Sequence, residues 1–221
     1  MIYWRKWGIL FLFIIAFFTH SWAIDKPPQE VTEAASRGLE DFIKKKPQRA
    51  LYRHGFADRQ EIETAFLGEG FHVYTILPDE FLKEDPNQNL DELLIPTNIW
   101  QFIILSHQKS KAVLSVDKFR NQWMAVSIGS AGLAKQLQKA IEAWPESDGY
   151  SWKLVRIYQA RSDFVAIYQN DVFLGLVPLT SARVAMVLQK LDFFPLELHS
   201  LSEMMRILRP IVRDNLRTQT K

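Results

Sequence analysis

Cysteine is absent from the 221-residue chain. Its absence excludes disulfide bonds, thiol nucleophiles and the usual cysteine-ligated zinc sites. A small exported domain often needs such cross-links, but a chain of this length buries enough surface to fold without them. Seven tryptophan and fifteen phenylalanine residues provide large apolar side chains for a core. We therefore expect a fold that hydrophobic burial stabilises.

Long apolar runs are also scarce. The run Gly8–Phe18 spans eleven residues, fewer than the about 18 that a permanent membrane span requires. Basic residues precede this run, and Ser21 and Ala23 follow it at the small-residue positions of a signal-peptidase site. This order predicts a secretory signal peptide over 1–23, cleaved near Ala23, and export to the periplasm or the extracellular space. The alternative is an uncleaved leader that anchors the protein to the inner membrane.

Excess charge is lacking once the leader is removed. Loss of Arg5 and Lys6 leaves 25 of the 27 basic residues, which balance the 25 acidic ones. A neutral chain has no overall field that would steer nucleic acid toward it. The aromatic residues of the strand-like segments lie among apolar neighbours, which indicates core packing rather than a base-stacking surface. We expect neither a nucleic-acid partner nor a cofactor.

The N-terminal part of the mature chain combines helices with one strand. Residues 30–46 predict a helix, because apolar side chains recur there at helical spacing: Val31, Ala34, Ala35, Leu39 and Phe42. A short helix is expected at about 58–66, with Asp58 as its N-cap. A break bounded by glycines then precedes a strand at 71–76. Residues 78–98 predict a polar surface loop with a short helical piece.

The next part of the chain predicts two similar units, each of three strands and a helix. The strand-like runs of the first unit are 99–105, 111–117 and 122–128, and its helix is 131–144. Those of the second unit are 152–158, 164–169 and 172–179, and its helix is 182–191. Seven of fourteen positions are identical between 126–139 and 177–190. This identity predicts an internal duplication.

The resulting fold class is α+β. Two β-β-β-α repeats, with antiparallel sheets and packed helices, follow an N-terminal helical segment and precede a C-terminal amphipathic helix. The apolar stripe of that last helix is Leu201, Met204, Leu208, Ile211 and Val212. Pro210 is expected to kink or end it. The expected divisions are the signal peptide 1–23, a helix, strand and acidic loop at 24–98, the repeats 99–145 and 150–192, and the terminal helix and tail 196–221.

A serine stands at the head of each repeat helix. The segment around Ser130 is similar to a nucleophile or phosphate-binding turn, but residue 128 is isoleucine where a nucleophile elbow has glycine, and no Gly-Lys-Ser/Thr is present. The second segment keeps Ser181 and replaces both glycines. A serine before a helix commonly accepts hydrogen bonds from free backbone N–H groups. We therefore expect Ser130 and Ser181 to be structural N-caps.

The acidic loop holds a candidate metal site. Its oxygen-bearing residues alternate as in a calcium loop: Asp85, Asn87, Asn89 and Asp91. A complete calcium loop also needs glycine at the sixth position and glutamate at the twelfth, where this chain has Leu90 and Pro96. A solvated acidic loop is the competing interpretation.

No catalytic residue is predicted. The histidines of the mature chain lie in separate segments, without the spacing of a zinc peptidase: His54, His72, His107 and His199. Carboxylates are numerous, but no local spacing singles out a glycosidase pair.

The C-terminal helix offers a candidate partner-binding surface. Four arginines recur along one side of it at spacings of three and four residues: Arg206, Arg209, Arg213 and Arg217. Such a ladder suits an acidic protein or the anionic headgroups of a membrane surface. The competing interpretation is a solvated face that complements the helix dipole.

Three stretches of the chain resemble secreted bacterial proteins of no assigned activity. They are HGFADRQEIETAFLGEGFHVYTILP at 54–78, PTNIW at 96–100 and AVSIGSAGLAKQL at 125–137. The resemblance covers about residues 34–141. It implies an exported α+β domain and transfers no catalytic residue.

Together these features favour an exported, non-catalytic binding or protein-interaction module of the cell envelope. Its partner would be a protein or a small molecule, held between the two repeats or on the terminal helix. An envelope hydrolase whose site is invisible in the sequence is one alternative. An inhibitor or chaperone-like accessory of a secreted protein is another.

Overall fold

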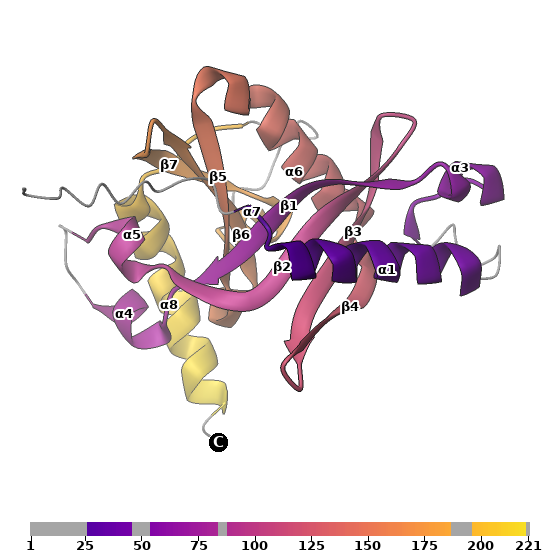
Figure 1. Ribbon diagram of the computed structural model, residues 1–221. Helices are drawn as coiled ribbons and strands as arrows, with labels where there is room; N and C mark the ends of the chain where they lie inside the picture. The colour runs from indigo at the N-terminus through magenta and orange to yellow at the C-terminus, as the bar shows by residue number, and fades with distance from the viewer. Residues whose placement is uncertain (1–25, 46–53, 84–87, 187–195, 220–221) are drawn as a thin grey trace, which may run out of the picture.

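The computed structural model describes residues 26–45, 54–83, 88–186 and 196–219 (Figure 1). The predicted signal peptide, two residues of the calcium-loop pattern (Asp85 and Asn87) and the end of the second repeat helix lie outside these ranges. Within them, no helix combines the length and the apolar character that crossing a membrane requires.

Seven strands form one mixed sheet in the order β4-β3-β2-β1-β5-β6-β7. They are β1 (Phe66–Thr75), β2 (Ile95–Ser106), β3 (Lys109–Phe119), β4 (Gln122–Gly129), β5 (Tyr150–Ile157), β6 (Ser162–Gln169) and β7 (Val172–Pro178). The central strands β1 and β5 pair in parallel, and the other neighbouring strands pair antiparallel. The α+β fold class is confirmed, and both predicted units belong to the same sheet.

Helices cover both faces of the sheet (Figure 1). They are α1 (Gln29–Lys45), α3 (Arg59–Glu63), α4 (Pro78–Leu82), α5 (Leu90–Leu93), α6 (Ala131–Ala143), α7 (Thr180–Ala185) and α8 (Leu201–Gln219), with short 3-10 turns η2 (Glu146–Asp148) and η3 (Tyr158–Ala160). Successive side chains of a strand point to opposite faces. In β6, Val165 and Ile167 pack with α6, whereas Phe164 and Ala166 pack with α8. Helix α6 therefore covers one face, and α1 and α8 lie on the other.

The long helices follow the predicted apolar spacing. Every residue of the stripe predicted for the first helix is buried in α1. Helix α3 begins after Asp58, whose carboxylate accepts the N–H of Glu61 at 2.8 Å, as predicted. Helix α8 buries Met204, Leu208 and Val212 against the sheet. Burial of a periodic apolar stripe thus decides where these helices lie.

Three hairpins of the sheet use two-residue turns. Both residues of each turn have positive φ: His107 and Gln108, Arg120 and Asn121, and Asn170 and Asp171. This backbone conformation matches the right-handed twist of the flanking strands and keeps the connections short.

One expectation about a chain break is wrong. Strand β1 begins at Phe66 and runs through Gly68 and Gly70, where a break was expected. A β-carbon at Gly70 would lie 2.7 Å from the ring of Phe102, so glycine there lets β2 approach closely. Of the two outcomes expected at Pro210, a kink or an end, the helix end is excluded because α8 continues through this residue.

The described residues do not confirm the internal duplication. Each unit is a three-strand meander followed by a helix, but α6 and α7 bury their side chains in clusters on opposite faces of the sheet. Residues that are identical in the two units also differ in their environment. Val126 is 56% exposed in β4, whereas Val177 is fully buried in β7.

Candidate functional site

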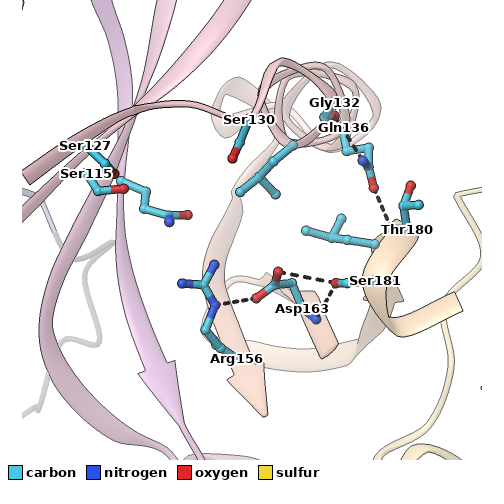
Figure 2. A pocket seen from close by; sticks show the side chains of 12 residues that line it. Ser115, Ser127, Ser130, Gly132, Gln136, Arg156, Asp163, Thr180 and Ser181 are labelled. Carbon is cyan, nitrogen blue, oxygen red and sulfur yellow. Dashed lines mark hydrogen bonds and ion pairs between the residues drawn. The ribbon is translucent and has the colours of Figure 1, made fainter. Parts of the chain in front are cut away.

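A polar cavity of about 480 Å³ opens on the face of the sheet that α6 covers (Figure 2). Strands β2, β3 and β4 and the start of α6 form one side of it, and β5, β6 and the start of α7 form the other. We call this space the polar cavity. Both halves of the sheet contribute to its lining, so it lies where the two meanders face each other.

The first wall is a row of polar side chains across three neighbouring strands. Gln101 of β2 is the register partner of Ser115 in β3, and Ser115 is the partner of Ser127 in β4. Gln101 is only 5% exposed, and its side-chain Oε1 accepts no hydrogen bond from the described residues. A buried acceptor without a partner costs about 1–3 kcal/mol of stability. Native proteins bury few such groups, so this one demands an explanation.

The opposite wall holds an ion pair. Arg156 and Asp163 are register partners on β5 and β6, and the Arg156 Nε donates to the Asp163 Oδ1 at 2.6 Å. The Ser181 hydroxyl donates to the other carboxylate oxygen at 3.3 Å and accepts the Asp163 N–H at 2.9 Å. Figure 2 shows the two terminal guanidinium nitrogens turned away from Asp163. They remain available as donors on the cavity side.

The third wall is the N-terminal turn of α6. Ser130 precedes the helix with φ 55° and ψ 51°, in the left-handed region, and its side chain makes no capping hydrogen bond. The first N–H groups of a helix have no intrahelical acceptor. Figure 2 shows Ser130 across the cavity from the Arg156–Asp163 pair. An uncapped helix start therefore borders the space, where its partial positive charge favours acceptor groups.

The capping hydrogen bonds expected of Ser130 and Ser181 are not formed: Ser130 occupies the N-cap position of α6 without one, and Leu179 occupies that position in α7. The left-handed backbone of Ser130 differs from the extended conformation in which a capping side chain usually reaches the helix N–H groups. Ser181 is the second residue of α7, which begins after Leu179, and its hydroxyl bonds to Asp163 instead. Both serines line the polar cavity.

A glutamine joins α6 to α7 at the rim. The Gln136 amide nitrogen donates to the Gly132 carbonyl at 2.9 Å, and its oxygen accepts the Thr180 N–H at 2.6 Å. This bridge fixes the two helix starts relative to each other.

The lining residues define what the polar cavity can do chemically. Arg156 and Asp163 are its charged members and balance each other, and the remaining polar groups are amides and hydroxyls. Such a set binds a polar molecule through hydrogen bonds. A serine nucleophile needs a base within reach. The lining includes neither histidine nor lysine, and the Asp163 carboxylate is engaged by Arg156 and Ser181.

The described part of the calcium-loop pattern is used for packing. Asn89 accepts the N–H of Asp91 at 3.1 Å and caps α5. The Asp91 Oδ1 accepts from Lys153 at 2.8 Å and from the Tyr168 hydroxyl at 2.7 Å. Burial, together with Asp91, raises the pKa of Tyr168 well above its ordinary value, so the phenol stays a donor. Within the ranges that the structure describes, no three potential metal-ligating side chains of the His, Asp and Glu type cluster.

The arginine ladder divides into two kinds of residue. Arg209 donates to the backbone carbonyls of Phe81 and Lys83, at 3.3 and 2.7 Å, and so joins α8 to α4. The other members are exposed: Arg206, Arg213 and Arg217. A surface for an acidic partner would depend on these three.

Sequence reasoning missed Gln101, Arg156 and Asp163, which carry the chemistry of the polar cavity. Arg156 and Asp163 are neighbours on β5 and β6, but Gln101 is far from both in the chain and shares the cavity with them only because β1 joins the two halves. One signal was available for two of them. Gln101 and Arg156 each interrupt an apolar strand, in IWQFIIL and WKLVRIY. A polar side chain within an apolar run marks a position that burial alone does not explain.

Comparison of the chain with family models, with curated proteins and with solved structures finds no match. The class of protein is therefore defined by its own fold and site. It is an α+β protein with a mixed seven-stranded sheet and a polar cavity between the starts of α6 and α7.

Proposed function

We propose that this protein is an exported, non-catalytic binding protein of the cell envelope that holds a small polar ligand in the polar cavity. The observation that carries the proposal is the Oε1 of Gln101, a buried acceptor without a partner among the described residues, on a residue that lines the cavity. Stability alone gives no reason to keep such a group. A ligand that donates a hydrogen bond to this oxygen would give such a reason. Export rests on the leader at 1–23.

The position of the polar cavity supports ligand-dependent stabilisation. Gln101 in β2 and Ser130 before α6 belong to the first unit of the chain, and Arg156 and Asp163 belong to the second. A ligand that contacts both would hold the halves together. Binding to the folded state alone at a hundred times the dissociation constant adds about 2.7 kcal/mol.

The hydrolase alternative has weaker support. Ser130 lies between a strand and a helix in a sparsely populated backbone conformation, which is a feature of some nucleophiles. Its activation would need a base beside its hydroxyl. Incubation with ester and glycoside substrates, compared with a Ser130→Ala variant, tests this directly.

The proposal is tested with Gln101→Met in the purified protein. Methionine fills a similar volume without the buried oxygen, so we expect the free energy of unfolding to rise by about 1 kcal/mol. A thermal-shift screen of sugars, amino acids and carboxylates should give at least one compound that raises the melting temperature of the wild type. That compound should leave the variant unchanged.

Ser106→Ala is the matched control for the stability effect. Ser106 is buried and polar like Gln101, but its hydroxyl donates to the Glu61 carbonyl at 2.8 Å. Loss of that hydroxyl removes this hydrogen bond, leaves the Thr64 hydroxyl as the remaining side-chain donor to the carbonyl, and should cost about 1 kcal/mol. A comparable loss in Gln101→Met, or a screen in which no compound shifts the wild type, would contradict a binding role for the cavity.

A further inference from the structure

We propose that the ligand of the polar cavity is a small carboxylate with a hydrogen-bond donor on a neighbouring carbon, of the hydroxy-acid or amino-acid class. This inference rests on the binding function proposed above. It assigns the carboxylate to Arg156, in the field of the uncapped start of α6, and the donor to Gln101.

The carboxylate is assigned from the donors around the cavity. The first turn of α6, thirteen residues long, borders the space without a side-chain cap. Its free N–H groups and the helix dipole favour a negative group. Arg156 uses Nε on Asp163 and keeps its terminal nitrogens, which match the two oxygens of a carboxylate. The charge of Asp163 is held by Arg156 and Ser181, so it opposes an anion less than a free carboxylate would.

The donor is assigned from Gln101, which is an observation independent of the helix. Its unpaired Oε1 is an acceptor and gains nothing from a carboxylate oxygen. A hydroxyl or an ammonium group satisfies it. A ligand without a donor leaves this oxygen buried and unpaired, and sites built in this way discriminate strongly against such analogues. Inorganic sulfate, which has acceptors only, is therefore disfavoured.

The test compares probes that differ in these two groups. Gluconate and glutamine carry a carboxylate with donors on neighbouring carbons, glucose carries donors without the carboxylate, and hexanoate carries the carboxylate without donors. Binding to the purified protein is followed by calorimetry and by ligand-observed NMR. We expect gluconate or glutamine to bind at least about tenfold more tightly than glucose and hexanoate, since each of the latter two lacks one of the hydrogen-bonding groups that the cavity would pair.

The variants separate the two ends of the ligand. Gln101→Met should remove the advantage of gluconate or glutamine over hexanoate. The double variant Arg156→Gln/Asp163→Asn keeps a neutral hydrogen-bonded pair and should remove the advantage over glucose. Arg37→Gln removes an exposed arginine from α1, on the other face of the sheet, and should change neither. Circular dichroism of each variant shows that it is folded.

The possible failures are distinct. If glucose binds as tightly as gluconate and glutamine, the ligand class is wrong and the binding function stands. If hexanoate binds as tightly, the role of Gln101 is wrong. If none of the four probes binds while another compound of the thermal-shift screen does, the class is again overturned. If nothing binds, both proposals fall.

Discussion

At the residue scale, two buried polar side chains of similar depth serve opposite purposes. The hydroxyl of Ser106 is bonded to the Glu61 carbonyl and helps to hold α3 against β2. The oxygen of Gln101 has no partner among the described residues. Hydrogen bonding, more than burial, therefore distinguishes the structural Ser106 from Gln101, whose oxygen a ligand would satisfy under the proposed function.

Ser130 provides a prediction about backbone strain. A residue other than glycine in the left-handed region costs about 1–2 kcal/mol of backbone strain, which glycine would relieve. Glycine, however, loses more conformational entropy on folding, and this loss offsets about 0.5–1 kcal/mol of the relief. We expect Ser130→Gly to raise the free energy of unfolding by less than about 1 kcal/mol, measured by urea denaturation. Ser130→Ala should change it by no more than about 0.5 kcal/mol. A loss of about 1 kcal/mol in the alanine variant would indicate that the hydroxyl caps α6 after all.

Glu69 provides a prediction about pH. Burial raises the pKa of this carboxyl above 4.5, and the nearby Glu146 raises it further. The folded protein therefore holds a proton that the unfolded chain releases, and stability falls as the pH rises from 4.5 through the folded pKa. We expect Glu69→Gln to stabilise the protein at neutral pH, and the gain to disappear below pH 4.5. Urea denaturation across a pH series measures this, and a gain that is independent of pH would contradict it.

At the element scale, α8 is held by both apolar burial and one arginine. Arg209 donates to two carbonyls at the end of α4, and lysine cannot reproduce that fork. We expect Arg209→Lys to lower the free energy of unfolding by about 1–2 kcal/mol. The exposed Arg206 is the matched control, and Arg206→Lys should stay within about 0.5 kcal/mol. Equal effects in urea denaturation would show that the two arginines are equivalent.

The elements differ in how far the sequence predicts them. Helices α1, α6 and α8 were predictable because their apolar residues recur at helical spacing, and burial selects that face. The extent of β1 was not predictable from its own residues. Gly68 and Gly70 look like a chain break in the sequence, and only the close approach of β2 explains them within a strand. The serines illustrate the same limit for the site. Their position before helical segments was visible, but the backbone of Ser130 and the bond from Ser181 to Asp163 depend on tertiary contacts.

At the scale of the whole molecule, α6 unites the two halves. Leu137 is fully buried in a cluster that combines Ile103 and Val113 from the first half with Val165 and Ile167 from the second. The strand order that creates this cluster could not be predicted, because it depends on pairing between distant segments.

The shared cluster predicts one cooperative unfolding transition. Leu137→Ala should lower the free energy of unfolding by about 2–5 kcal/mol. Native-state hydrogen exchange should show the amides of β3 and β6 losing protection together. Two separate transitions, or loss of protection in one half alone, would mean that the halves are independent.

The parallel seam between β1 and β5 affects how the chain reaches this state. Each meander joins neighbouring stretches, whereas the seam pairs Val73 with Leu154, far along the chain. Local contacts form before distant ones, because closing a long loop costs more entropy. During vectorial synthesis, the first meander is therefore complete while β1 still presents a bare edge and the apolar side of α6 lacks half its neighbours. Until the C-terminal half is synthesised, the chain exposes an unpaired strand edge and apolar surface, both of which promote aggregation. Folding of the second meander then covers both.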